Sequence, residues 1–219
     1  MKSILKSNSS FLLPFSFFLL AGAIALLVNS KTDLHLAINS IHNRHLDIFF
    51  YYITYLGDGL VAVLTIIILL TVKYRYALIV GISYAISSMF TQLLKRTMFE
   101  DVVRPKKFFE GIHDLYFVPG TENHLYNSFP SEHATTAFAL YFSLALIVKN
   151  STLKFFLFVV ALLVGFSRIY LSQHFLSDVY AGASIGVFVT FISYWIIQKS
   201  KAQWLDRSLV ASINLGDKG

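Results

Sequence analysis

The chain has 219 residues, of which 56% are hydrophobic and only 14% are charged. A soluble globular domain carries about 25% charged residues, so this composition argues against a water-soluble protein. The sequence contains no cysteine, which excludes disulfides, cysteine nucleophiles and thiolate metal sites. The formal net charge of +6 is better explained by basic cytoplasmic loops of a membrane protein than by nucleic-acid binding.

Apolar stretches long enough to cross a bilayer as helices recur along the sequence. The first follows Lys2 and Lys6 and could instead be a signal peptide cleaved near Ala21-Gly22-Ala23, but its apolar run continues to Val28. We therefore expect a retained helix. The fold class predicted is an all-α, multi-pass bundle in which 1–219 form one domain. Its six spans are expected at about residues 11–28, 52–72, 76–94, 131–148, 155–170 and 178–198.

Basic residues are distributed unevenly between the loops. If the N-terminus is cytoplasmic, that side carries ten lysines and arginines against two acids, Asp206 and Asp217. Because cytoplasmic loops are enriched in lysine and arginine, we predict that both termini are cytoplasmic. The long loop 95–130 would then lie on the outer, periplasmic face of a bacterial inner membrane.

Polar residues at the span ends are predicted to converge on this outer face, where odd-numbered spans exit and even-numbered spans enter. Ionisable residues at membrane depth are costly and are usually functional or paired. A site is therefore expected where the span ends meet. The residues concerned are Lys95, Arg104, Ser131, His133, Arg168, His174 and Asp178.

The residue types in this cluster suit phosphate chemistry. Its three cations can bind phosphate oxygens, and Ser131 follows Pro130 at a helix start, where free N–H groups favour an anion. His174 and Asp178 are four residues apart on one helical face. The carboxylate can hold one ring nitrogen protonated while the other attacks phosphorus. His133 could protonate the leaving oxygen.

Each feature also has a simpler explanation. The His–Asp pair could be structural, the cations could bind lipid headgroups, and Ser131 could be only an N-cap. A metal site formed by His133, His174 and Asp178 is another alternative, although the sequence contains no HExxH pattern. Their joint occurrence on one face favours catalysis.

Three segments resemble motifs of the type 2 phosphatidic acid phosphatase family. Phe129-Pro130-Ser131-Glu132-His133 is similar to its PSGH motif, with Glu132 in place of glycine. The segment from Ser167 to Asp178, with Arg168 and His174, fits SRx5Hx3D without a gap. The motif Kx6RP is matched less well, because eight residues separate Lys95 from Arg104 and seven separate Arg96 from Arg104. Either the loop holds two extra residues or Lys95 is not the family's lysine.

The resemblance implies an integral membrane lipid phosphatase that needs no metal or other cofactor. By analogy, His174 forms a phosphohistidine, Asp178 orients it and His133 transfers protons. The phosphoryl oxygens would be bound by Lys95, Arg104, Ser131 and Arg168. The implied substrate is a phosphomonoester or diphosphate of a membrane lipid, such as undecaprenyl diphosphate, phosphatidylglycerophosphate, phosphatidic acid or a lipid A phosphate. A lipid phosphotransferase and an anionic-lipid transporter are the alternatives. An intramembrane serine protease using Ser131 would leave the three cations unexplained.

Other residues carry weaker expectations. A carboxylate beside bound phosphate would repel it, so we expect Glu132 to point away and to pair with Lys106 or Lys107. Asp58, between two glycines, is expected to cap a helix or to support the site indirectly.

The aromatic residues of loop 99–129 indicate an interfacial belt or a lid over the lipid. The glycines Gly182 and Gly186 indicate close helix packing within the bundle. The sequence assigns no role to His35, His42 or His45, and it leaves the oligomeric state open.

Overall fold

The computed structural model of the protein describes residues 2–210, and every regular element in this range is a helix. Asp217 and Lys218, which entered the predicted charge balance, lie outside the described residues. The helices are α1 (Lys2–Ser7), α2 (Ser9–Val28), α3 (Lys31–Asn39), α4 (Arg44–Ile53), η1 (Thr54–Gly57), α5 (Gly59–Val72), α6 (Tyr74–Thr97), α7 (Pro105–Phe108), α8 (Glu132–Ile147), α9 (Ser151–Tyr170), α10 (Leu176–Lys199) and η2 (Gln203–Asp206).

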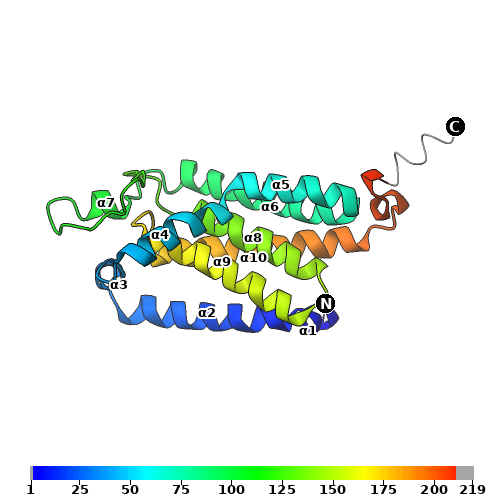
Figure 1. Ribbon diagram of the computed structural model, residues 1–219, viewed down its shortest axis with the longest axis horizontal. Coiled ribbons are helices and arrows are strands. Elements are labelled where there is room, and N and C mark those ends of the chain that lie inside the picture. The colour runs from blue at the N-terminus through cyan, green and yellow to red at the C-terminus, as the bar shows by residue number, and fades with distance from the viewer. Residues whose placement is uncertain (1, 211–219) are drawn as a thin grey trace.

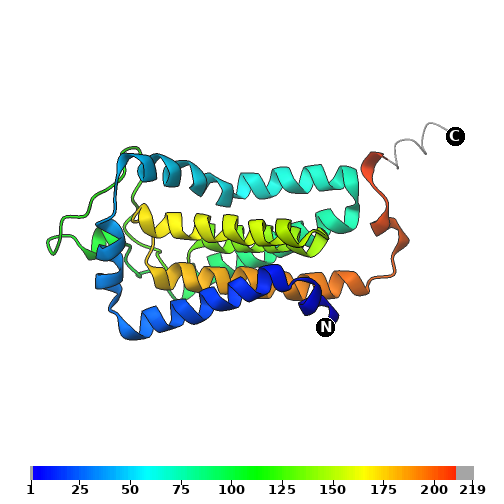
Figure 2. The same cartoon turned by 60° about the horizontal axis from the view of Figure 1, so that its bottom comes forward.

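The long helices form an elongated bundle with two different ends (Figures 1 and 2). α1 and η2 lie at one end, and α3, α7 and residues 98–131 lie at the other, which we call the loop end. Helix α8 packs against α6, α9 and α10, and 12 of its 16 residues are buried. The apolar core is therefore organised around α8.

The predicted number of spans is not established by the structure. Four helices, α2, α6, α9 and α10, are long and apolar enough to cross a membrane within the described range. A fifth span results if Arg44–Gly57 and Gly59–Val72, which meet at a 51° bend, count as one. Helix α8 has 16 residues, a length of about 24 Å, against about 30 Å of hydrocarbon. Because α8 is buried among other helices, its apolar sequence does not by itself distinguish a membrane crossing from a core helix.

The bend replaces the continuous helix expected over residues 52–72, and Asp58 lies at it. The Asp58 backbone is extended, and its carboxylate accepts a hydrogen bond from the Leu60 amide at 2.8 Å. This is an N-cap that starts α5 anew. The interpretation of Asp58 as a helix cap is therefore confirmed.

Close packing of α10 on α8 depends on Gly182 and Gly186. A Cβ atom at Gly186 would lie 2.5 Å from the carbonyl oxygen of Thr135, and one at Gly182 would collide with the carbonyl oxygen of Ser131. Only glycine permits this approach. The predicted packing role inside the bundle is confirmed, and it brings the first turns of the two helices together.

Some basic residues counted as cytoplasmic anchors are engaged inside the protein. The Arg75 guanidinium binds the Asp206 carboxylate at 3.0 Å and the Ile197 carbonyl at 2.8 Å. The Lys154 ammonium donates to the side chain of Asn8 at 2.6 Å. These cations fasten helix ends to one another at the end opposite the loop end.

The aromatic loop does not form only an interfacial belt. Phe109 and Val118 are buried, and Phe108 packs edge-on against Phe175, with ring centroids 5.4 Å apart. Tyr116 stays half exposed. The loop therefore packs on the segment that joins α9 to α10, which bears on the site described next.

Candidate active site

A cavity of about 460 Å³ lies at the loop end and collects most of the predicted site residues. Seven of the nine line it, and the two that do not are Ser131 and Asp178. The helices α6, α8 and α9 and the turn before α10 all contribute to its wall. The seven lining residues are Asp58, Lys95, Arg104, Glu132, His133, Arg168 and His174.

His174 is placed by the turn between α9 and α10. The amides of Gln173 and His174 both donate to the Arg168 carbonyl, at 2.9 and 3.0 Å, so the turn folds back on the end of α9. His174 is 2% exposed. Burial lowers the pKa of His174 well below its usual range, although Asp178 acts in the opposite direction. The ring is therefore the neutral, nucleophilic form at neutral pH.

Asp178 supports the ring from behind. Its Oδ2 accepts hydrogen bonds from the Ser128 hydroxyl at 2.5 Å and from the Phe175 amide at 3.0 Å. The same oxygen lies 3.4 Å from His174 Nδ1, longer than an ordinary hydrogen bond, and Nδ1 makes no other bond to a described residue. Such contacts often tighten when substrate binds. Nε2 is the ring nitrogen left to face the cavity.

Arg168 lines the cavity and has one buried side-chain donor without a partner among residues 2–210. Its Nη1 donates to the Thr54 hydroxyl at 2.8 Å, whereas its buried Nε has no partner among residues 2–210. An unpaired buried N–H costs about 1–3 kcal/mol. A phosphate oxygen would satisfy it, and guanidinium is suited to that acceptor.

Lys95 and Arg104 meet despite their longer spacing. The Lys95 ammonium and the Arg104 Nη2 both donate to the Asn127 carbonyl, at 3.1 and 3.4 Å. Arg104 also binds the Tyr126 carbonyl and the Gln173 side chain, at 2.9 and 3.4 Å. The extra residues of the loop therefore do not separate the two cations.

His133 and Ser131 occupy different positions at the start of α8. His133 is half-buried and lines the cavity. The Ser131 hydroxyl is fully buried and accepts from the Ala134 amide at 3.4 Å, while the Ser131 amide donates to the Asp178 carbonyl at 2.9 Å. Ser131 thus caps α8 and ties it to α10, outside the cavity lining.

Glu132 lines the cavity instead of pointing away from it, and it does not pair with Lys106 or Lys107. Its carboxylate accepts from the Gln92 amide at 2.5 Å and lies 3.4 Å from the Ser88 hydroxyl, and Lys107 pairs with Glu110 instead. Helix α6 passes beside the start of α8, so its polar face reaches Glu132 before the loop does. Glu132, Lys95 and Arg104 also line a second cavity, of about 540 Å³.

Sequence reasoning missed three polar residues that hold the site. Thr54 binds Arg168, Ser128 binds Asp178, and Gln173 binds Arg104. The Gln173 amide also reaches the carbonyl of Glu122 at 2.8 Å. Of the three, only Thr54 could have been singled out from the sequence, as a polar residue near an apolar stretch. Ser128 and Gln173 lie in loops, where polar residues are ordinary.

Comparison with known proteins identifies this arrangement. Residues 76–202, which carry every predicted site residue except Asp58, match the model of the PAP2 superfamily. The chain belongs to this superfamily. It is 27% identical to a lipid A 4′-phosphatase of Bacteroides thetaiotaomicron over 82% of both chains. It is 28% identical to the undecaprenyl-diphosphatase BcrC of Bacillus subtilis, over 71% of this chain and 77% of that one.

Solved structures agree with the family. LpxE of Aquifex aeolicus superposes with a TM-score of 0.66 and 28% identity, over 74% of this chain and 93% of that one. A PAP2-type phosphatidylglycerolphosphate phosphatase of Bacillus subtilis gives a TM-score of 0.62 and 26% identity, over 90% and 98%. The protein is thus an integral membrane enzyme of a phosphatase family whose matched relatives act on lipid phosphates.

Proposed function

We propose that the protein hydrolyses a phosphomonoester or diphosphate of a membrane lipid through a phosphohistidine formed on His174. The observation that carries the proposal is the shared cavity. It contains a neutral imidazole with a carboxylate behind it, a second imidazole, and three cations, one of them with an unpaired buried donor. Phosphoryl transfer depends largely on positioning and electrostatic stabilisation, and this set of residues provides both.

The proposed reaction has two steps. In the first, His174 Nε2 attacks phosphorus while the bond to the leaving oxygen breaks, which is the ester oxygen of a monoester or the bridging oxygen of a diphosphate. His133, which carries a proton in the complex with the anionic lipid phosphate, gives that proton to the leaving oxygen. Nδ1 keeps its proton, which Asp178 stabilises as the ring gains charge. In the second, His133 takes a proton from water, the resulting oxygen attacks phosphorus, and the P–N bond breaks. Inorganic phosphate leaves and His174 is restored.

The cations stabilise the transferring group. Lys95, Arg104 and Arg168 surround the space in front of His174 and oppose the charge that spreads over the phosphoryl oxygens. Their joint charge supplies what a metal ion would otherwise supply, so activity is expected to persist in EDTA. Ser131 contributes as the cap that fixes α8 and with it His133.

The lipid is expected to enter from the bilayer. A lipid A phosphate, undecaprenyl diphosphate and phosphatidylglycerophosphate are the first substrates to test, because relatives are named for activity on them. Phosphatidic acid is the fourth candidate. We propose that the loop end is periplasmic and that six crossings, α8 included, place both termini in the cytoplasm. This orientation follows from the charge balance of the loops.

Phosphate release from the purified protein tests the proposal. Detergent-solubilised enzyme is given each lipid with EDTA present, and His174→Ala is compared with His45→Ala, which removes an exposed imidazole from the same end. The proposal expects phosphate from at least one lipid, lost in the first variant and kept in the second. Phosphate found on a second lipid would indicate a phosphotransferase. Lipid movement without phosphate release would indicate a transporter.

A further inference from the structure

The turn that carries His174 contains a residue in an unusual backbone conformation. Ser172 has φ of 53° and is 1% exposed. This left-handed region is disfavoured for residues with a Cβ atom. Ser172 is two residues before His174, so its conformation directs the chain toward the position of the nucleophile.

Two side chains of α3 hold the Ser172 hydroxyl. His35 Nε2 lies 3.2 Å from Ser172 Oγ, and the Asn39 amide nitrogen donates to the same oxygen at 3.3 Å. The two residues are four apart and so share one face of α3. The His35 ring is 2% exposed, with centroids 5.5 Å from Phe109 and 5.3 Å from Phe175, the residue that follows His174.

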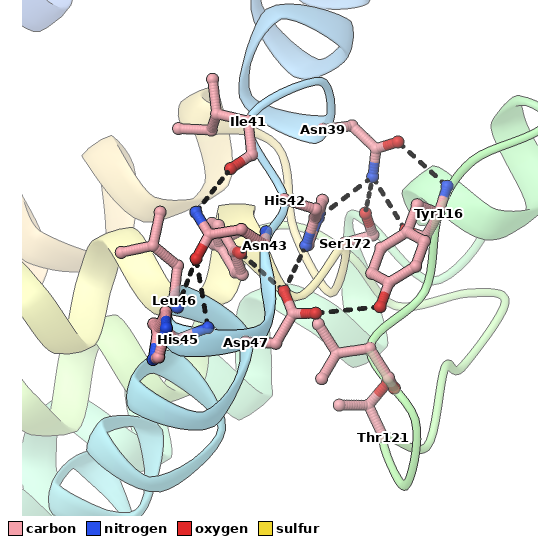
Figure 3. Close-up of polar contacts among 12 residues, drawn as sticks. Asn39, Ile41, His42, Asn43, His45, Leu46, Asp47, Tyr116, Thr121 and Ser172 are labelled. Atoms are coloured by element: carbon pink, nitrogen blue, oxygen red, sulfur yellow. Dashed lines mark hydrogen bonds and ion pairs between the residues drawn. The ribbon is translucent and has the colours of Figure 1, made fainter.

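The same contacts extend to the long loop and to the other side of the turn (Figure 3). The Asn39 side chain donates to the Tyr116 carbonyl at 2.8 Å and accepts from its amide at 3.0 Å. The Tyr116 hydroxyl donates to Asp47 at 2.9 Å, and Tyr170, two residues before Ser172, donates to Asp47 at 2.6 Å.

We call these residues the collar; they are His35, Asn39, His42, Asp47, Tyr116, Tyr170 and Ser172. His42 Nδ1 completes the collar with a 2.8 Å contact to Asp47. The turn is therefore held by hydrogen bonds at two positions, Tyr170 and Ser172. No collar residue is among those lining the cavity, so the collar acts on the reaction indirectly, through the turn and the long loop that it contacts.

We propose that His35 and Asn39 are positioning residues that fix the His174 imidazole in line with the bound phosphate by holding Ser172. The inference rests on the proposed function, because it treats His174 as the nucleophile. A displacement of about 1 Å at a reacting atom costs about 100-fold in rate. Holding a reacting atom to that tolerance requires supporting residues that are themselves fixed by packing and hydrogen bonds. The buried His35 ring and the two hydrogen bonds to Ser172 give the turn this support.

Three variants separate positioning from folding. Ser172→Gly removes the hydroxyl but keeps the left-handed backbone accessible, because glycine adopts it freely. His35→Ala removes the ring, and His35→Gln returns an amide nitrogen near the position of Nε2. Ser40→Ala is the matched control, since this exposed hydroxyl at the end of α3 binds only the Ala37 carbonyl among the residues that the structure describes.

Turnover is measured per mole of enzyme that can be phosphorylated, so that unfolded protein does not enter the value. Ser172→Gly and His35→Ala are each expected to lower kcat 10- to 100-fold with KM within threefold. The double variant should have the same kcat as the single variants, because both substitutions remove the same contact between His35 and the Ser172 hydroxyl. His35→Gln should recover at least part of the loss, and Ser40→Ala should match the parent protein.

Unchanged kcat in both variants would overturn the inference. So would a rise in KM that matches the fall in kcat, or a loss of kcat that His35→Gln does not reduce. The His174→Ala variant distinguishes failure of the proposed function from failure of the positioning role. If it retains activity, the proposed function fails; if it is inactive while the collar variants are normal, only the positioning role fails.

Discussion

Substitution of Gly186 by alanine tests whether the distance between α8 and α10 controls catalysis. A Cβ atom there would lie 2.5 Å from the Thr135 carbonyl oxygen and 2.9 Å from the Ala139 amide nitrogen, whereas ordinary contacts begin at 3.4 Å. Both obstacles are backbone atoms, which cannot rotate away. The helices must therefore separate by about 0.9 Å, the shortfall at Thr135.

The separation acts on both stability and rate. Overpacking of this kind costs about 1–3 kcal/mol, and a loss of about 2 kcal/mol lowers Tm by roughly 4–8 °C in a protein of this size. It also strains the 2.9 Å hydrogen bond from the Ser131 amide to the Asp178 carbonyl, which ties the two helix starts. With His133 on α8 and His174 before α10, a shift of nearly 1 Å predicts a fall in kcat of about 100-fold.

Gly81→Ala is the matched control. The Cβ atom added in α6 would meet Ile66 at 3.7 Å, an ordinary contact, so this variant should keep its kcat and melt no lower than the parent. Thermal melting in detergent and steady-state phosphate release measure both variants. If Gly186→Ala behaves like Gly81→Ala in both assays, the reasoning from helix separation is wrong.

Three further outcomes are expected. Arg168→Lys should lower kcat/KM for phosphate release by about 100-fold. The planar guanidinium can donate to Thr54 and to a phosphate oxygen at the same time, whereas the lysine ammonium cannot hold both in this geometry. Glu132→Gly should lower KM for a diphosphate more than for a monoester, because a negative charge next to Lys95 is removed; equal KM changes would exclude a sorting role. Burial lowers the pKa of His35 to about 4 from 6.5, so the unfolded state binds this proton first as pH falls. Through His35 alone, the free energy of unfolding should fall by about 3 kcal/mol between pH 6.5 and pH 4. Thermal melts over this pH range should show a smaller fall for His35→Gln than for the parent protein.

The parts of the site that follow from local geometry were predictable from the sequence. A spacing of four residues places His174 and Asp178 on adjacent turns, and alternation of span directions brings Arg168 and His133 to one end of the bundle. Neither inference needs knowledge of distant packing. The spacing of four residues between Gly182 and Gly186 in α10 likewise predicted close helix contact without other information.

The remainder depends on contacts that no local pattern encodes. His35 and Ser172 are 137 residues apart in sequence, and nothing in either neighbourhood indicates their pairing. Glu132 was assigned to the wrong partners because the prediction placed it against the loop, whereas α6 lies closer. The apolar sequence of α8 could not reveal that its side chains meet other helices and not lipid.

Direct detection of the covalent intermediate tests the central claim most closely. The enzyme is mixed with a lipid substrate labelled in the phosphate and quenched in alkali, and the labelled peptide is mapped. We predict acid-labile phosphate on His174, absent from His174→Ala and formed as fast as turnover requires. Label on Ser131, or steady turnover without any labelled protein, would contradict the account.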